Sequence, residues 1–356
     1  MKIHAPLLIA ISGLIFSQAA NAQLVEAKTV PVGVMSNTVA GSPNGNTFKI
    51  TPIFVPLHSA FVVSGPKTGK ISGVGPNSLT VGSAGWSAGE LSAASSPFYL
   101  KLNSGSAEGR IFHITSNTLD TLTVNPQGLD LTTLGILTGA SGDQFQIVKG
   151  ETLASFLGTV ADGVIGGSAA NFNSGLTDRI LANDASGTVR SFYFDTTTAP
   201  NQWRRLGSSA NQDTTPVSPF AGVLYYRIST TSLVFEFTGE APTTNALRQI
   251  SNTGTTVLST NFPVDYTLAS LSANSMPGWR KLNDSGVVLN STDRLFAPDG
   301  SGTIRSYSHD GVSWRRQGAS GSQDGIAISA GSAIYVTRFG SPGSSTWNLQ
   351  IPYNLN

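Results

Sequence analysis

One segment occurs twice in this sequence, and this repeat restricts the possible folds more than any other feature. The segment TDRILANDASGTVRSFYF begins at Thr177, and TDRLFAPDGSGTIRSYSH begins at Thr292, an offset of 115 residues. Upstream, the letters TLAS recur at the same offset, and downstream the letters WRR recur at an offset of 111. The deletion falls in a polar turn, where a change of loop length costs little. The pattern therefore predicts a duplicated unit of about 85 residues.

The sequence around these blocks is typical of short antiparallel strands. Runs such as FYLKLN, RIFHITSN and TLTVNP have strand length and are bounded by Gly, Pro, Asn and Ser. In RIFHITSN, residues alternating from Ile111 face one way and those alternating from Phe112 face the other. Only ETLASFLG from Glu151 and YTLASLSA from Tyr266 carry the apolar stripe of a helix, for one or two turns.

We therefore expect an all-β chain with one or two short helices. Its second part is a duplicated small antiparallel β module, sandwich-like or barrel-like, and its first part is a separate β domain. The expected organisation is a signal peptide over 1–22, an N-terminal β domain over 23–150, and two module copies over 151–240 and 241–356.

The start, MKIHAPLLIAISGLIFSQAANA, is typical of a secretory signal peptide with an A-x-A cleavage site before Gln23. Its apolar run is shorter than the ~20 residues of a membrane span, and no later stretch is apolar enough to span. The absence of Cys excludes disulfides and a lipid-bearing Cys. These features predict export to the periplasm, the cell surface or the extracellular space.

The chain is poor in charge. Without Lys2 it would carry 20 basic and 20 acidic residues, and charged residues make up 12% of the sequence, against ~25% in typical soluble domains. Such a surface has no electrostatic reason to bind nucleic acid or anionic lipid, and little repulsion to prevent association. Exposed sheet edges can accept strands from neighbouring chains, so we expect further copies or other envelope proteins as partners.

Several segments together suggest a family. The signal peptide combined with KTVPVGVM, SGSAEGRIFHITSNT, GDQFQIVKGETLASFLG, TDRILANDASGTVRSFYF and WRRLGS resembles a group of uncharacterised exported β-rich proteins of Verrucomicrobia-type bacteria. The resemblance extends over nearly the whole chain after the signal peptide. It implies no known activity.

The duplicated charges allow two interpretations. In the structural one, Arg and Asp form bidentate ion pairs that hold hairpins together, and we favour it because duplication copies scaffolds as readily as sites. The residues expected in such pairs are Asp178, Arg179 and Arg190, with their counterparts Asp293, Arg294 and Arg305. In the functional one, each unit binds a glycan through Arg while Trp stacks on a sugar face. The candidates are Trp203, Arg204 and Arg205, with Trp314, Arg315 and Arg316.

Catalytic and metal-binding signals are weak. The letters GWSAG place Ser87 in a G-x-S-x-G pattern, with His113 or His309 as the base, but no helix pattern follows as a nucleophile elbow requires. The histidines after the signal peptide have no paired metal-ligand spacing. Asp184 and Asp299, one in each hairpin turn, offer a single carboxylate each, whereas Ca²⁺ takes six to eight oxygens. We expect neither a metal nor a cofactor.

These observations favour an exported, non-enzymatic structural or adhesive protein of the bacterial envelope or extracellular space. The alternative is a carbohydrate-binding protein that uses the repeated Trp-Arg-Arg segments. A secreted hydrolase is a distant third hypothesis.

Overall fold

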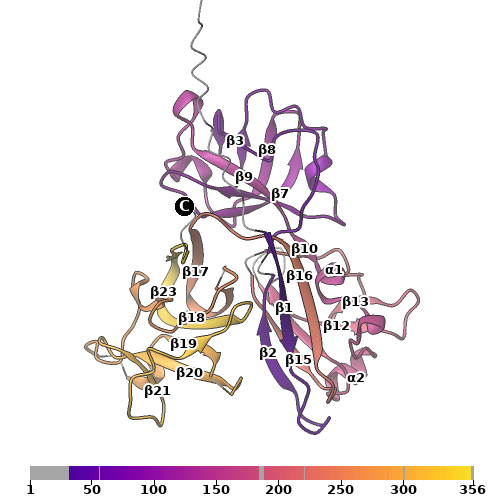
Figure 1. Ribbon diagram of the computed structural model, residues 1–356, viewed down its shortest axis with the longest axis vertical. Helices are drawn as coiled ribbons and strands as arrows, with labels where there is room; N and C mark the ends of the chain where they lie inside the picture. Colours follow the sequence, from indigo (N-terminus) through magenta and orange to yellow (C-terminus); the bar gives the residue numbers. More distant parts are fainter. Residues whose placement is uncertain are drawn as a thin grey trace, which may run out of the picture. The chain divides into compact units, whose positions relative to one another are not determined.

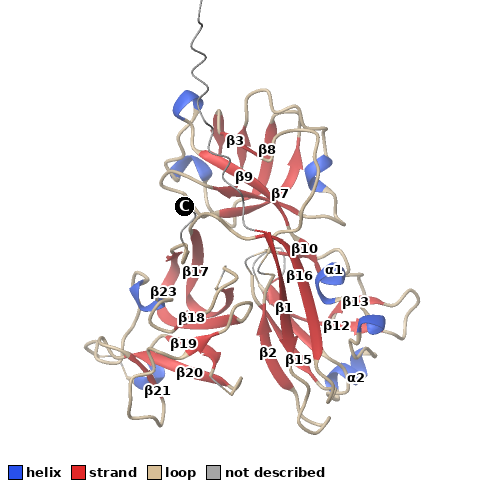
Figure 2. Cartoon of the chain, in the orientation of Figure 1, coloured by secondary structure: helices blue, strands red, loops and turns tan. Residues whose placement is uncertain are grey.

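The computed structural model describes residues 32–55, 57–183, 188–219, 221–260, 262–286, 288–299 and 301–353 (Figure 1). Antiparallel strands joined by turns make up most of this part of the chain, and the helices are short (Figure 2). The prediction of an all-β fold is confirmed. Within the same residues, no helix has the length and apolar character that crossing a membrane requires. The predicted signal peptide, residues 1–22, lies outside the described residues.

Residues 68–149 form one antiparallel sheet of seven strands with its own hydrophobic core. Alternation decides which side chains enter that core: Phe112 and Ile114 of one strand and Leu122 and Val124 of the next are buried on the same face. The strand order is β3-β9-β6-β7-β8-β5-β4. The strands are β3 (Thr68–Lys70), β4 (Gly73–Gly75), β5 (Ser78–Thr80), β6 (Phe98–Leu102), β7 (Ile111–Asn117), β8 (Thr121–Asn125) and β9 (Gln144–Lys149), with 3-10 turns η1 (Glu90–Ser92), η2 (Leu131–Thr133) and η3 (Gly139–Ser141).

A second sheet has the order β13-β12-β11-β15-β2, and two strand pairs, β1-β16 and β10-β14, accompany it. Its core contains Ile180, Phe192 and Trp203. The strands are β1 (Val32–Val39), β2 (Lys49–Ile53), β10 (Glu151–Thr152), β11 (Arg179–Asn183), β12 (Val189–Asp195), β13 (Gln202–Arg205), β14 (Pro216–Val217), β15 (Val223–Arg227) and β16 (Leu233–Glu240), with α1 (Leu153–Leu157), η4 (Val160–Asp162) and α2 (Ala169–Asn173).

The third sheet has the order β17-β23-β19-β20-β21, with the pair β18-β22 beside it. Its core contains Leu295, Tyr307 and Trp314. The strands are β17 (Ala246–Ser259), β18 (Tyr266–Thr267), β19 (Arg294–Pro298), β20 (Ile304–His309), β21 (Trp314–Arg316), β22 (Ala327–Ile328) and β23 (Ala333–Leu349), with η5 (Ala273–Ser275) and η6 (Leu289–Ser291).

The second and third sheets share strand order and register. Strands β13, β12, β11 and β15 occupy the places that β21, β20, β19 and β23 occupy in the other sheet. Val223 pairs with Ile53, and Ile334, 111 positions further on, pairs with Leu258. The strand β2 therefore corresponds to the second half of β17.

The correspondence continues into the ribbon β1-β16. Leu233 pairs with Val39, and Ser344, again 111 positions further on, pairs with Ser251. Together, β1 and β2 thus correspond to the single strand β17, and β15 and β16 correspond to β23. Each unit is longer at its start than the repeated letters indicate.

This correspondence corrects the expected boundary at residue 150. The strands β1 and β2 lie within the expected N-terminal domain 23–150, yet they pair with β16 and β15, and Val39, Ile53 and Val55 belong to the core around Trp203. The seven-stranded domain is therefore an insertion into the first module, between β2 and β10. Sequence comparison missed this because ladder hydrogen bonds use backbone atoms, so VMSNTV (34–39) and ALRQIS (246–251) can take the same place without sharing residues.

The two segments expected to be helical differ in outcome. In the first, Thr152 and Ser155 form a reciprocal cap, and α1 follows. In the second, Thr267 and Ser270 exchange the equivalent hydrogen bonds at 2.8 and 3.1 Å, but the segment forms only a turn before η5. The expected helix from Tyr266 is therefore wrong, although its cap is present.

Equivalent residues of the two modules meet at a close approach of their backbones. Gly222 and Ala333 occupy matching positions, and a Cβ on Gly222 would lie 2.4 Å from the Cβ of Ala333 and 2.8 Å from the carbonyl oxygen of Leu258. Nearby, the N–H of Phe54 donates to the carbonyl of Gly331 at 3.2 Å. Only glycine fits at position 222.

The first prediction concerns this contact. Gly222→Ala forces the two modules apart, and overpacking of this kind lowers the free energy of unfolding by about 1–3 kcal/mol. Urea unfolding measures the loss. Gly321→Ala is the control, because a Cβ there meets no atom within 4 Å. Adding Ala333→Gly removes the nearest clash and should recover part of the stability; an unchanged midpoint in Gly222→Ala would contradict the contact.

Candidate functional site

Asp178, the first acidic residue of the repeated line, lies in a buried network. Its Oδ2 accepts hydrogen bonds from Arg227 Nη1 at 2.5 Å, from the Tyr225 hydroxyl at 2.8 Å and from the Ile165 N–H at 3.0 Å. Its Oδ1 accepts from the Ile228 N–H at 3.0 Å. The Asp178 and Arg227 side chains are 0% and 3% exposed. A buried carboxylate is tolerated because its charge and its lone pairs are both satisfied.

Asp293 repeats the arrangement in the second module. Its Oδ2 accepts from Arg338 Nε at 2.6 Å and from the Arg280 N–H at 2.9 Å, and its Oδ1 accepts from the Phe339 N–H at 2.8 Å. The Arg338 guanidinium also lies 5.4 Å from the centroid of the Trp279 ring. In both modules the arginine comes from the strand that pairs with the strand following the aspartate, β15 with β11 and β23 with β19.

Arg179 contacts aromatic rings rather than a carboxylate. Its guanidinium lies 4.5 Å from the ring centroids of both Phe48 and Phe172. It makes no ion pair with the described residues, which corrects its expected role. The physical reason is that the adjacent Asp178 is buried and held by the arginine of β15. Arg294, the counterpart, is half-buried on β19.

The strand arginines lie near the hairpin turns. Arg305 Nε donates to Asp299 Oδ2 at 2.9 Å, and Arg316 Nη1 lies 3.9 Å from the same oxygen. Hydrogen bonds from the Ser301 hydroxyl and from Arg305, together with backbone donors, hold the pKa of Asp299 far below its usual range. Arg190 is exposed at the matching position on β12, and Asp184 lies outside the described residues.

The second prediction tests the buried pairs. Asp178→Asn or Asp293→Asn leaves an arginine buried without its counter-charge, and the free energy of unfolding should fall by about 3–5 kcal/mol. The control is Arg305→Ala, which breaks a partly exposed pair and should cost at most about 1 kcal/mol. Thermal and urea unfolding give the comparison. Equal losses in the buried and the exposed variants would contradict the structural role.

Both tryptophans of the repeated Trp-Arg-Arg segment belong to the cores. Trp203 is 0% exposed and its Nε1 donates to the Gly158 carbonyl at 2.9 Å. Trp314 is 1% exposed, with the rings of Trp279 and His309 edge-on at 5.8 and 5.3 Å. No ring face remains for a sugar. The hypothesis that these tryptophans stack on a glycan is therefore wrong.

The neighbouring arginines form ion pairs within each module. Arg204 Nε lies 2.7 Å from Asp195 Oδ2, and both side chains are buried. At the matching positions, Arg315 Nε lies 2.6 Å from Asp310 Oδ2, with both side chains partly exposed. Arg205 is half-buried on β13. The segment expected to bind a ligand thus packs its tryptophan and pairs its first arginine.

The G-x-S-x-G segment does not form a nucleophile elbow. Ser87 lies in a loop, its N–H donates to the Ser64 hydroxyl at 2.7 Å, and only the three-residue turn η1 follows. Across the residues that the structure describes, no hydrogen bond joins Ser87 to His113 or His309. The same residues contain no group of three His, Asp or Glu side chains arranged to hold a metal ion.

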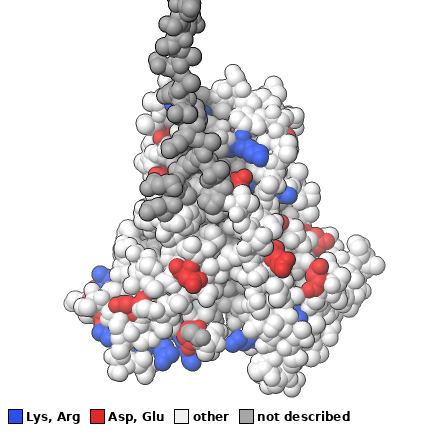
Figure 3. Space-filling view, viewed as in Figure 1, with Lys and Arg blue, Asp and Glu red and all other residues white. Residues whose placement is uncertain are grey.

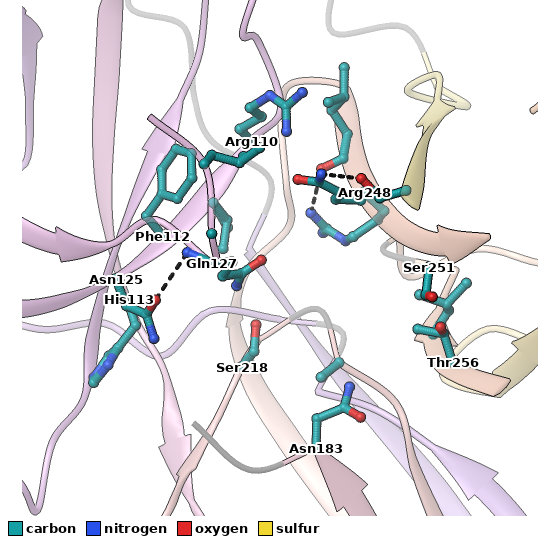
Figure 4. A pocket seen from close by; sticks show the side chains of 18 of the residues that line it. Arg110, Phe112, His113, Asn125, Gln127, Asn183, Ser218, Arg248, Ser251 and Thr256 are labelled. Atoms are coloured by element: carbon teal, nitrogen blue, oxygen red, sulfur yellow. Dashed lines mark hydrogen bonds between the residues drawn. The ribbon is translucent and has the colours of Figure 1, made fainter. Parts of the chain in front are cut away.

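A cavity of about 510 Å³ is lined by residues of the inserted domain and of both modules (Figure 4). Its size lies within the ~300–1,000 Å³ usual for ligand pockets. Arg110 immediately precedes β7 and His113 lies on it (Figure 4). Asn125 and Gln127 come from the end of β8 and the turn after it, and Arg248 comes from β17.

The lining combines polar hydrogen-bonding groups with an apolar part. Phe112, Leu129, Leu247 and Val257 supply apolar surface, while guanidinium, imidazole, amide and hydroxyl groups supply donors and acceptors. None of the described lining residues is Asp or Glu. This contrasts with the surface seen in Figure 3, where acidic and basic residues both occur, few and scattered among uncharged ones.

Basic groups also lie near the cavity within the protein. Burial lowers the pKa of Arg248 to about 9. Burial and the nearby charge of Arg248 lower the pKa of Lys101 to about 7, against a smaller opposing effect of Glu108. Burial, then Lys101 and Arg248, lower the pKa of His58 to about 3. The Lys101 Nζ donates to the Thr244 carbonyl at 3.4 Å.

Sequence reasoning missed the cavity because its basic residues are not duplicated. Arg248 corresponds in the first module to Ser36, and Arg110 belongs to the insertion, which occurs once. Arg110 is the first residue of the predicted strand RIFHITSN. The alternation of side chains predicted the strand but gave no reason to single out this residue. Comparison with protein-family models, with curated proteins and with solved structures found no match.

The third prediction follows from the lowered pKa of Lys101. Between about pH 7 and its ordinary value of 10.5, the unfolded chain holds a proton on this lysine that the folded chain lacks. The free energy of unfolding therefore rises with pH in this window, by up to about 1.4 kcal/mol per pH unit. Lys101→Met removes this contribution. Urea unfolding of the variant and the original protein at pH 6 and pH 9 gives the comparison. The increase in free energy of unfolding caused by the substitution should be larger at pH 6 than at pH 9, and a pH-independent difference would contradict the assignment.

Proposed function

We propose that this chain is an exported, non-enzymatic adhesive protein that binds a hydroxyl-rich glycan in the cavity between Arg110 and β17. Export is proposed from the signal peptide that the sequence predicts, and adhesion from the cavity. The observation that carries the proposal is the lining: amide, hydroxyl and guanidinium groups around an apolar part, in a volume of about 510 Å³. A sugar offers hydroxyl groups and apolar C–H faces to such a mixed surface.

The difference between the two modules supports a ligand at this place. Val39 and Leu233 pair in the first module and are buried there. Their counterparts are Ser251 and Ser344, which pair in the second module, are exposed, and line the cavity. The same scaffold thus carries apolar residues where it covers a core and hydroxyl groups where it faces the cavity.

Binding without hydrolysis is proposed from the same lining. Most glycoside hydrolases use two carboxyl groups on either side of the scissile bond. The described lining residues supply none. The arrangement favours retention of a sugar over its cleavage.

The fourth prediction tests the cavity. Ser251→Trp fills it, and should reduce retention of the chain, residues 23–356, on immobilised oligosaccharides at least tenfold. Surface plasmon resonance over a panel of neutral and acidic oligosaccharides gives the affinities. The matched control is Ser322→Trp, at an exposed serine outside the cavity. The Ser322 hydroxyl accepts a hydrogen bond from the Asp324 N–H, as the Ser251 hydroxyl accepts one from the Thr253 N–H.

The same experiment separates adhesion from assembly through sheet edges. Light scattering over a range of concentrations should give a constant mass for the original protein and both variants. Growth into large assemblies, with no retention of any oligosaccharide, would overturn the proposal and return the role to a purely structural one. Equal retention by both tryptophan variants would place the site elsewhere.

A further inference from the structure

We propose that a ligand in this cavity stabilises one arrangement of the two modules, and that the inserted domain couples ligand binding to that arrangement. The inference rests on the proposed function and goes further, because it concerns how the site is regulated. Two observations carry it. The cavity is lined by the inserted domain and by both modules, and each of these three bodies has its own hydrophobic core.

The three cores are separate. The cluster around Phe112 contains residues of the inserted domain, the cluster around Trp203 residues of the first module, and the cluster around Trp314 residues of the second. Within the described part of the chain, none of these clusters extends over two bodies. Domains that do not share a large apolar interface are expected to move relative to one another. The cavity therefore lies where three bodies meet without a common core.

The inserted domain contacts the connection between the modules, residues 241–245, which runs from β16 to β17. The Leu247 N–H donates to the carbonyl of Gly109 at 3.0 Å, and the Thr244 hydroxyl donates to Asn103 Oδ1 at 3.2 Å. We call these contacts the clamp. Because they join polar groups, water can replace them when the clamp opens, and the cores stay closed.

The two modules also contact each other through polar groups. Asn37 Nδ2 of the first module donates to the Gly331 carbonyl of the second at 3.1 Å, and the Phe54 N–H donates to the same carbonyl at 3.2 Å. These bonds hold the modules together at one place, and the clamp holds their connection at another. The angle between the modules therefore depends on whether the clamp is closed.

Gly109 makes the closest approach of the clamp. Its φ is +84°, and a Cβ there would lie 2.6 Å from the Asn245 carbonyl oxygen and 2.7 Å from the Leu247 nitrogen. The next residue, Arg110, lines the cavity, whereas Gly109 does not. Gly109 is therefore a positioning residue. A side chain at this position would push the inserted domain away from β17 without entering the cavity.

A ligand that fills the cavity contacts all three bodies. Gln127 comes from the inserted domain, Ser218 from the first module and Ser251 from the second (Figure 4). Contacts to all three form together only when the clamp is closed, so a ligand favours the closed state by its difference in affinity for the two states. By the same linkage, the apparent affinity falls with the fraction of molecules in which the clamp is closed.

The test measures the arrangement of the bodies directly and uses the absence of cysteine from the chain. Ser209→Cys in the first module and Ser320→Cys in the second place spin labels at exposed, matching positions outside the cavity, and Ser95→Cys does so in the inserted domain. Double electron–electron resonance gives the distance distributions for the pairs 209–320 and 95–320 in the chain, residues 23–356. The probes are maltohexaose, cellohexaose and oligogalacturonate, with affinities from isothermal titration. A bound probe should narrow both distributions.

Gly109→Ala should open the clamp. We expect both distributions to broaden without a probe, and the affinity to fall roughly 3- to 30-fold, as the closed fraction falls. A saturating probe should narrow the distributions again, a response that a misfolded variant would not give. The matched control is Gly139→Ala in the same domain, at a φ of +79°, because a Cβ there meets no atom within 4 Å. It should leave the distributions unchanged.

A milder variant protects the test against misfolding of Gly109→Ala. Thr244→Val removes only the hydroxyl that donates to Asn103, and should weaken binding in the same direction by roughly two- to fivefold. Adding Asn103→Ala should weaken binding little further, because both substitutions remove the same hydrogen bond. Melting temperatures check that each variant folds.

The outcomes separate this inference from the proposed function. Binding that Ser251→Trp abolishes, with the same affinity and the same distributions in Gly109→Ala as in the original protein, would overturn the coupling and leave the glycan site standing. Binding that leaves every distribution unchanged would do the same. Broadening by Gly109→Ala without binding of any probe would overturn the proposed function, and with it the stabilisation by a sugar.

Discussion

The buried Asp–Arg pair of each module is the interaction on which the rest of its sheet depends. Asp178 connects the loop that enters β11 to Arg227 at the end of β15, the strand that pairs with both β11 and β2. Asp293 and Arg338 do the same for β19 and β23. A charge this deeply buried is stable only with its partner in place, so the pair fixes which strand ends lie together and with them the register of the sheet.

The repeated letters predicted the scaffold and not its full extent. Charges copied in a charge-poor chain identified the duplicated strands β11 to β13 and β19 to β21, because hairpins of that kind depend on particular side chains. The strands β1 and β2 share no repeated residues with their counterpart β17, because backbone pairing and general apolar character fix their place in the sheet. The tryptophans were visible as repeated residues, but a sequence does not show whether a ring points into a core, as Trp203 and Trp314 do.

The insertion explains why the candidate site had no sequence signal. Arg110 comes from a domain present once, and Arg248 stands where the first module has Ser36. A backbone contact alone brings the two arginines to one cavity. The N–H of Leu247 donates to the carbonyl of Gly109 at 3.0 Å. Leu247 is next to Arg248, and Gly109 is next to Arg110. Residues so far apart in sequence, without a repeat or a motif spacing, become a site only through that backbone contact.

The residues that the two modules share and the residues of the proposed site are thus different sets in this molecule. What the two modules share is buried and paired: the Asp–Arg networks, the packed tryptophans and the capped turns. At the cavity the second module has polar residues where the first does not or has smaller ones, with Ser251 and Ser344 in place of Val39 and Leu233 and Arg248 in place of Ser36. Shared residues maintain the fold, whereas the proposed site takes different residues from each copy and from the inserted domain. The unshared polar residues beside the inserted domain are therefore where specificity should lie.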